Sequence, residues 1–252
     1  MNRAKAAKKG LWARLIDAQL DDDERRRLRH VPTRLNEYGY DAFGFNREDF
    51  RLGLLMARFF YKTYFRARCF GIENLPQGRV MLVANHSGQL PFDALTIGGA
   101  LFYEANPPRI MRAMIERFVA KLPFVGRFFA GTGQVIGTEA NCERLLADEE
   151  AILVFPEGTA GISKPITRRY QLQPFGLGFL RLALRTKTPI VPVAVIGAEE
   201  QAPAFNVRPL AKLLGAPAFP VMPIPPFFPI LPLPTRYRIY FGEPRCFAGD
   251  PD

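Results

Sequence analysis

The sequence predicts an α/β protein with a mostly parallel central sheet flanked by helices, preceded by an N-terminal amphipathic helical region. From residue 70 onward, short apolar runs alternate with helical stretches. The apolar runs carry few charges and are bounded by turn residues, which is typical of strands buried on both faces of a parallel sheet. Such alternation of strands and helices is the pattern of an α/β fold.

The individual elements follow from periodicity and from chain-breaking residues. Apolar runs predict buried strands at 80–84, 109–114, 151–155 and 189–196, a short strand within 131–136, and a last edge strand at 236–241. Helical periodicity predicts helices at 94–103, 139–148 and 175–185, with a helix break at 121–126 around Pro123. We expect backbone amides at the start of the 94–103 helix to help stabilise developing negative charge.

Residues 1–70 are predicted to form a basic, membrane-associating helical region, and residues 71–252 the α/β domain. The first 30 residues combine lysines and arginines with Leu11, Trp12, Leu15 and Ile16. The stretch 48–69 predicts a helix with a basic stripe formed by Arg51, Arg58, Lys62 and Arg66. This stripe is either the solvated side of a core helix or an interfacial surface whose cations meet lipid phosphates.

Composition limits the partners and the compartment. The net charge of +10 and the pI of about 9.8 indicate an anionic partner surface. No nucleic-acid-binding signature accompanies this charge, so we expect an anionic membrane and no nucleic acid. The three scattered cysteines have no metal-binding spacing and indicate reduced thiols. Without a signal-peptide or spanning-helix pattern, we expect a cytoplasmic protein that lies peripherally on the inner face of a membrane.

A segment rich in proline and phenylalanine occupies residues 201–234. Its prolines exclude a continuous helix and most central-strand positions. The segment is either a rigid wrap over one side of the core or an apolar lip that enters a bilayer or borders an acyl-chain tunnel.

The strand at 80–84 ends on Asn85-His86, and Asp93 follows on the far side of the turn. Loops at strand ends are where α/β proteins place reactive groups. A neutral imidazole accepts a proton, and a carboxylate on its other nitrogen orients the ring. Alternatively, His86 is a turn residue hydrogen-bonded to backbone.

A second motif, Phe155-Pro156-Glu157-Gly158-Thr159, follows the strand at 151–155. Asn-His with a following aspartate, and then Phe-Pro-Glu-Gly-Thr, resembles the glycerolipid acyltransferase family over about residues 75–200. The resemblance implies that His86 is a general base oriented by Asp93, and that Asn85, Glu157, Gly158 and Thr159 shape the acceptor site. It also implies an acyl-CoA or acyl-carrier-protein donor and a lipid acceptor, with no metal and no further cofactor.

The sequence departs from the family pattern in three places. Six residues instead of four separate His86 from Asp93, and the middle motif is degraded at 133–138. The arginine that often follows Glu-Gly-Thr is replaced by Ala160, and Arg168 and Arg169 are the candidate substitutes. Because arginine is the usual bidentate phosphate ligand, we hypothesise that the acceptor is a neutral hydroxyl lipid such as diacylglycerol, or another hydroxylated lipid that is not lysophosphatidate.

Two other functions are compatible with parts of the sequence. A catalytically weak lipid-binding protein on the same scaffold would explain the departures, although His86, Asp93 and Glu157 are all retained. A lipid-surface hydrolase would need a Gly-x-Ser-x-Gly elbow and a second usable histidine, and the sequence has neither.

Overall fold

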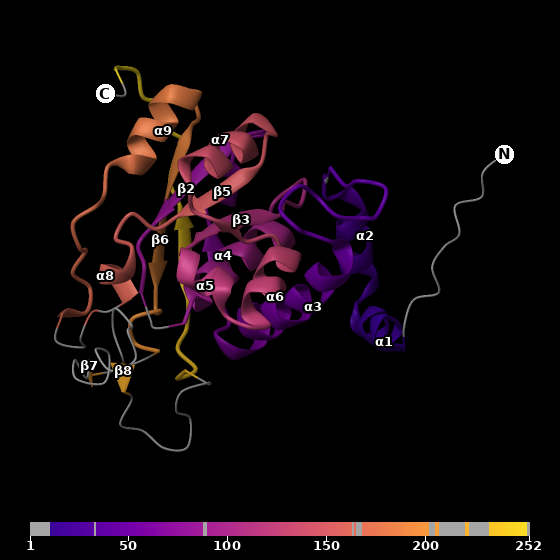
Figure 1. The fold of residues 1–252 in the computed structure, drawn as a ribbon. Helices are drawn as coiled ribbons and strands as arrows, with labels where there is room; N and C mark the ends of the chain where they lie inside the picture. The colour runs from indigo at the N-terminus through magenta and orange to yellow at the C-terminus, as the bar shows by residue number, and fades with distance from the viewer. Residues whose placement is uncertain are drawn as a thin grey trace.

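A computed structural model describes residues 11–32, 34–87, 90–162, 164, 168–201, 205–206, 220–221 and 232–250. In this part of the chain, seven strands form one sheet in the order β1-β9-β6-β2-β5-β3-β4 (Figure 1). The strands are β1 (Arg68–Phe70), β2 (Val80–Ala84), β3 (Met111–Ile115), β4 (Val135–Ile136), β5 (Ala151–Val154), β6 (Ile190–Ile196) and β9 (Arg238–Phe241). The predicted mostly parallel α/β fold is confirmed.

One edge of the sheet differs from the prediction. Strand β9 runs antiparallel to β6 and is covered by β1, so it is an interior strand instead of the expected edge. Strand β1 escaped prediction because the preceding helix was expected to reach residue 69. In the structure, α3 (Arg47–Arg58) continues as a π-helix η1 (Phe59–Tyr64), and Arg66 adopts a left-handed φ of 47°, which ends the helix.

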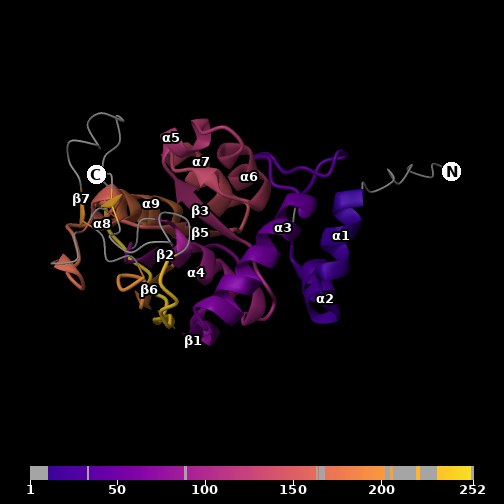
Figure 2. The same ribbon diagram turned by 90° about the horizontal axis from the view of Figure 1, so that it is seen from below.

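The sheet is covered by helices on both faces because alternate side chains of its strands point in opposite directions (Figure 2). Leu82 of β2 packs into a core shared with α3 and α4 (Phe92–Tyr103), whereas Met81 packs against α7 (Glu139–Ala147) and α9 (Gly178–Thr186). Both side chains are fully buried. The strand is therefore apolar throughout, as a doubly covered parallel strand requires.

The remaining described helices are short. They are η2 (Ile72–Asn74), α5 (Arg117–Lys121), α6 (Val125–Thr132) and α8 (Thr159–Ile162). The predicted break at 121–126 is confirmed, since α5 ends at Lys121 and α6 begins at Val125. Helix α5 follows directly on β3, which runs parallel to β5. Helix α5 therefore begins at the carboxyl-end edge of the sheet.

The described part of the N-terminal region begins with two helices, α1 (Leu11–Gln19) and α2 (Asp22–His30). Helix α2 begins at a capping box in which the carboxylates of Asp21 and Glu24 each accept a hydrogen bond from the backbone amide of the other residue. Glu24 is completely buried and accepts hydrogen bonds from Tyr103 Oη (2.8 Å) and Arg58 Nη1 (2.9 Å). The charged run at 21–27 is therefore a helix start that docks on the core.

The basic stripe of α3 and η1 has protein partners that the sequence did not predict. Arg51 pairs with Asp17 (3.1 Å) and Arg58 pairs with Glu24, so both point toward α1 and α2. Lys62 is exposed and lies over the Tyr103 ring, and the exposed Arg66 donates to the Pro234 carbonyl. Contact of these four cations with a membrane stays a prediction.

Several predicted features fall on residues that the structure does not describe. The basic residues at 3–9 and most of the proline-rich segment at 201–234 lie outside the described residues. Within that segment, β7 (Phe205–Asn206) pairs antiparallel with β8 (Pro220–Val221). None of the helices in the described ranges is long and apolar enough to cross a membrane.

Candidate active site

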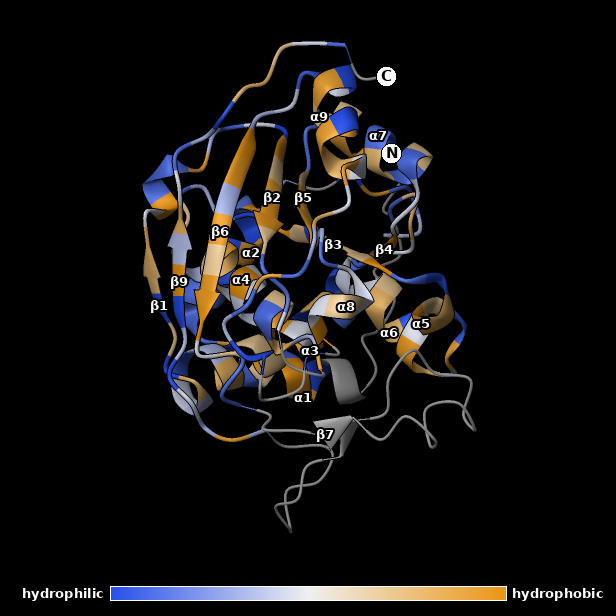
Figure 3. Cartoon of the chain, turned by 90° about the vertical axis from the view of Figure 1, so that its left-hand side faces the viewer, coloured by the Kyte–Doolittle hydropathy of each residue, from blue (hydrophilic) through white to orange (hydrophobic). Residues whose placement is uncertain are grey.

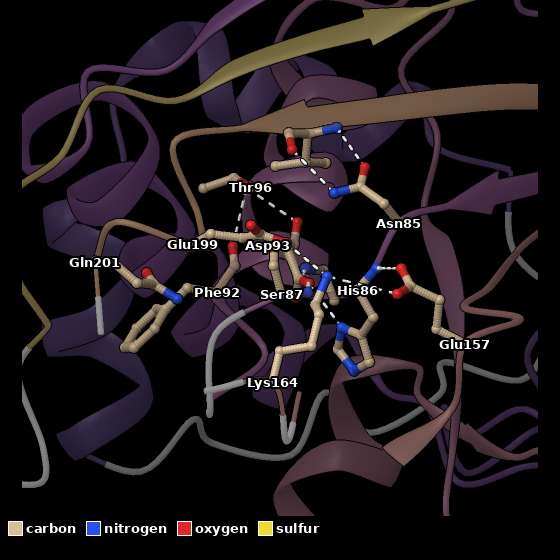
Figure 4. A network of polar contacts seen from close by, with 12 residues as sticks. Asn85, His86, Ser87, Phe92, Asp93, Thr96, Glu157, Lys164, Glu199 and Gln201 are labelled. Carbon is tan, nitrogen blue, oxygen red and sulfur yellow. Dashed lines mark hydrogen bonds and ion pairs between the residues drawn. The ribbon is translucent and has the colours of Figure 1, made fainter. Parts of the chain in front are cut away.

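The site lies at the carboxyl ends of three adjacent parallel strands. Strand β2 leads into Asn85 and His86, β5 leads into Glu157, and β6 leads into Glu199. Because β5 and β6 flank β2 in parallel register, these three chain ends meet at one edge (Figure 4). This edge is where open α/β sheets bind ligands.

His86 and Asp93 form a close pair despite their longer spacer. His86 Nδ1 lies 2.7 Å from Asp93 Oδ2. Asp93, in the first turn of α4, is completely buried and also accepts from the backbone amides of Ser87 (3.0 Å) and Ala94 (2.7 Å). Because an ionised carboxylate only accepts hydrogen bonds, Nδ1 is the donor, and in the neutral imidazole this tautomer places the lone pair on Nε2.

The imidazole ring is held from a second direction by Phe155. The two rings stack with their centroids 3.9 Å apart and their planes 14° from parallel. The His86 side chain keeps 14% of its surface exposed. Among the described residues, none hydrogen-bonds to the other ring nitrogen. A ring fixed at one nitrogen and along one face, with the second nitrogen available, is the geometry that a general base needs.

Glu157 braces the loops around His86. One of its carboxylate oxygens accepts from the His86 backbone amide (2.9 Å), and the other accepts from the Gln173 amide (2.8 Å). Lys164 Nζ lies 3.5 Å from the second oxygen and 2.6 Å from Glu199 Oε1. The Lys164 side chain is only 6% exposed, so this ammonium is buried between two carboxylates.

The residues around Glu157 are positioned by backbone geometry. Gly158 has a left-handed φ of 55°, which suits glycine, and a Cβ there would meet open space. Thr159 begins α8, which packs so closely on the site that a Cβ on Gly161 would lie 2.8 Å from His86 Cβ. Asn85 is bound at both ends of its amide group by the Val195 backbone.

Two nearby hydroxyl groups do not provide an alternative base or nucleophile. Ser87 Oγ is buried, so it does not face an entering substrate. Tyr237 is also fully buried and donates to Gln201, and burial together with Asp93 raises its pKa, which keeps the phenol neutral.

The expectation that the first amides of α4 stabilise negative charge stays a prediction, but three of these amides are already engaged. The Phe92, Ala94 and Leu95 amides already donate to Leu90, the Asp93 side chain and Pro91. These three groups are therefore not free to bind an oxyanion. Their hydrogen bonds instead fix the turn that returns Asp93 to His86.

An apolar cavity of about 270 Å³ adjoins the other side of this turn. It lies between α3, α4, α6 and β3, and its wall includes Leu90, Pro91, Phe92 and Ala94. His86 and Asp93 do not line the cavity, but Asp93 lies between two residues that do. The few polar side chains in its wall are Arg109, Thr132 and Gln134.

The structure brings together some of the predicted site residues and leaves others apart. His86, Asp93 and Glu157 form one network, with Asn85, Gly158 and Thr159 beside it. Arg168 and Arg169 are exposed, and neither side chain hydrogen-bonds to that network. Sequence reasoning missed Lys164, Glu199 and Gly161. Glu199 lies just beyond a predicted strand end, which is the signal that could have identified it.

These observations define an α/β protein with a His–Asp pair at the carboxyl edge of its sheet. Residues 66–196 match the family described as Acyltransferase, and the chain belongs to this family.

Relatives of known sequence support the assignment. The chain is 41% identical over 220 residues to an uncharacterized protein of Mycobacterium tuberculosis, covering 84% of this chain and 61% of that protein. A 1-acyl-sn-glycerol-3-phosphate acyltransferase of Saccharomyces cerevisiae is 31% identical over 136 residues, or 50% of this chain and 41% of its own. The chain therefore spans about three fifths of the mycobacterial relative.

The crystal structure of the 1-acyl-sn-glycerophosphate acyltransferase of Thermotoga maritima has a similar fold. Its TM-score is 0.54 at 17% sequence identity, with 93% of this chain and 77% of that chain covered. This likeness concerns the fold.

Proposed function

We propose that this protein transfers a fatty acyl group from an acyl thioester to a hydroxyl group of a glycerolipid or related lipid, with His86 as the general base. The observation that carries the proposal is the 2.7 Å contact between His86 Nδ1 and the buried Asp93, which leaves Nε2 open. Membership of the acyltransferase family supports the reaction class. The donor is acyl-CoA or acyl-carrier protein, and the lipid is reached from the surface of a membrane.

The reaction balances without a covalent enzyme intermediate. The acceptor hydroxyl oxygen attacks the thioester carbonyl carbon, and Nε2 of His86 takes the hydroxyl proton. The carbon–sulfur bond then breaks, and the proton passes to the departing thiolate. Asp93 stabilises the imidazolium while the positive charge is present. Glu157 contributes by holding the His86 backbone in place.

We propose the small apolar cavity as the site for the acyl chain. Its wall includes the residues on either side of Asp93, and nearly all of its lining is hydrocarbon. An acyl group placed there would have its first carbons near the His86–Asp93 turn.

The contacts at the acceptor side support an uncharged lipid over a phosphorylated one. Lys164 is already bound by Glu157 and Glu199, and Ala160 stands where the family often has arginine. Binding of Arg168 or Arg169 to the acceptor would require a side chain that now points to solvent. Preference for lysophosphatidate, with a selective rise in its KM in Arg168→Ala, would contradict a neutral acceptor.

The first experiment measures thiol release from a panel of acyl-CoA and acyl-carrier-protein donors with mixed micelles of hydroxyl lipids. We expect acceptor-dependent release that falls at least about a hundredfold in His86→Ala and in Asp93→Asn. His30→Ala, on the exposed end of α2, is the matched control. No release with any donor would favour the alternative of a lipid-binding protein.

The enzyme's own thiols set the background of this assay. Burial raises the pKa of Cys69 to about 12 and that of Cys142 to about 11. Cys246 is exposed. The assay uses a reagent that reacts with free thiols. At mildly alkaline pH, this reagent should therefore detect one thiol per chain, that of Cys246, before substrate is added.

A further inference from the structure

Residues 117–127, which we call the α5–α6 tip, form a second candidate membrane-contact surface besides the basic stripe. Its exposed side chains include Phe118 (50%), Leu122 (45%) and Phe124 (89%). Large apolar side chains that gather at one protruding point indicate an interaction site. The basic stripe of α3 and η1 also has exposed apolar neighbours, namely Leu52, Met56 and Phe59. Two of its four cations, however, are already paired with carboxylates of α1 and α2.

The backbone at the tip is built to hold Phe124 outward. Phe124, the residue that precedes α6, has a φ of 61°, a strained value for an aromatic residue. Gly126 allows the close turn, because a Cβ there would lie 2.2 Å from the Ala120 carbonyl oxygen. The chain therefore accepts local strain to place an apolar ring in water.

Cations surround these apolar side chains. Arg117, Lys121 and Arg127 are exposed, and within the described part of the chain none of them is in an ion pair. Glu116 is the neighbouring acid, so the tip has a net positive charge. Apolar side chains bordered by unpaired lysine and arginine match the boundary between acyl chains and anionic headgroups.

The tip also lies at the same sheet edge as the candidate active site. Helix α5 begins two residues after β3 ends, and β3 runs parallel to β5, whose end leads to Glu157. Figure 3 shows α5 and α6 as largely hydrophobic segments near the end to which β2 and β6 point. Ile115, Phe128 and Phe129, at the base of the tip, line the apolar cavity.

We propose that the α5–α6 tip inserts into an anionic lipid bilayer and turns the mouth of the cavity and the His86 edge toward the membrane. The choice of a lipid bilayer as the partner of the tip rests on the proposed function, acyl transfer to a lipid. The test, however, measures binding of the protein to vesicles, which does not require catalysis. His86→Ala should bind vesicles as well as the wild type does. Loss of acyl transfer in His86→Ala can thus be distinguished from loss of membrane binding by the tip.

The test is co-sedimentation with vesicles of phosphatidylglycerol and phosphatidylcholine, compared with pure phosphatidylcholine. We expect Phe124→Gly to weaken binding about tenfold without loss of thermal stability, because glycine tolerates the positive φ. Phe247→Gly removes another exposed phenylalanine (50%) far from the tip in the sequence and should bind normally. Combined Lys121→Glu and Arg127→Glu should weaken binding to the anionic vesicles at least tenfold, whereas Arg181→Glu on α9 should not.

Insertion itself is measured with Phe124→Trp in a Trp12→Phe background, since Trp12 is the sole tryptophan. Brominated lipids should quench this new tryptophan. Normal binding by Phe124→Gly and the charge-reversal variant would overturn the proposal. Release by Lys62→Glu alone would assign the membrane contact to the basic stripe instead.

Discussion

At the scale of single residues, Lys164 holds the acidic groups of the site together. Its ammonium lies between Glu157 and Glu199 and also donates to the Gln171 carbonyl (3.2 Å). Glu157 in turn supports the His86 backbone. Removing the cation would leave two buried carboxylates facing each other, and a lone buried charge is strongly destabilising.

We expect Lys164→Met to lower the free energy of unfolding by about 3 kcal/mol, because the change removes one partner of a buried ionic cluster. Urea denaturation measures this loss. Lys187→Met, at an exposed position, is the control and should change stability by less than about 0.5 kcal/mol.

A double-mutant cycle separates this pairing from simple loss of packing. If the pair is coupled, Lys164→Met combined with Glu199→Gln should cost less than the sum of the two single changes, since the second change removes an uncompensated charge. Strict additivity would show that Lys164 and Glu199 do not stabilise each other.

The residues that could be predicted are those with local signals. His86 and Glu157 follow apolar strands directly, so the sequence marks them as the ends of strands in a parallel sheet. Lys164 carries no such mark, because its partners come from two other strand ends and only the folded chain brings them together. The prediction that Arg168 and Arg169 bind the acceptor rested only on their closeness to Glu157 in the sequence. In the structure both side chains are exposed and do not hydrogen-bond to the network of His86, Asp93 and Glu157.

At the scale of elements, helix α4 connects the candidate base to the apolar cavity. Its first turn carries Asp93, and its next turns place Leu95 and Gly98 on the cavity wall. A Cβ on Gly98 would make ordinary contact with Met111 at 3.5 Å, so a side chain there must extend into the cavity. The volume available to an acyl chain thus depends on position 98.

We expect Gly98→Leu to reduce kcat/KM for long-chain donors about tenfold relative to short-chain donors, because the added carbons occupy the proposed acyl site. Competition between acyl-CoA donors of different length measures the change. Gly98→Ala adds only the first carbon and is the matched control. An unchanged chain-length preference in Gly98→Leu would exclude the cavity as the acyl site.

Elements with strong periodicity were predictable, and those whose existence depends on tertiary pairing were not. Strands β2 and β5 are buried on both faces and are therefore continuously apolar, and β6 is equally apolar in sequence although its alternate residues are exposed. Strand β1 has only three residues at the sheet edge and follows a π-helix, so its sequence continues the preceding helical pattern. The position of β9 could not be derived without knowing that β1 covers it.

At the scale of the whole molecule, the N-terminal helices share the core of the α/β sheet. Leu20 and Leu28 belong to the same buried cluster as Leu82 and Ile97. Glu24 adds a polar link, since it binds Tyr103 of α4 and Arg58 of α3. A boundary near residue 70 stays a prediction, but these contacts cross it, so we expect the two parts to unfold together.

Glu24→Ala tests this coupling. We expect it to lower the free energy of unfolding by about 3 kcal/mol, because it leaves the buried Tyr103 hydroxyl and the Arg58 guanidinium without their carboxylate. Asp22→Ala, whose side chain is 95% exposed, should cost less than about 0.5 kcal/mol. Fluorescence of Trp12 in α1 and far-ultraviolet circular dichroism of the whole chain should give coincident transitions in the wild type and in both variants. A Trp12 transition that precedes the main one in the wild type would show that α1 and α2 form a separate unit, and Glu24 would then stabilise their docking instead of the fold.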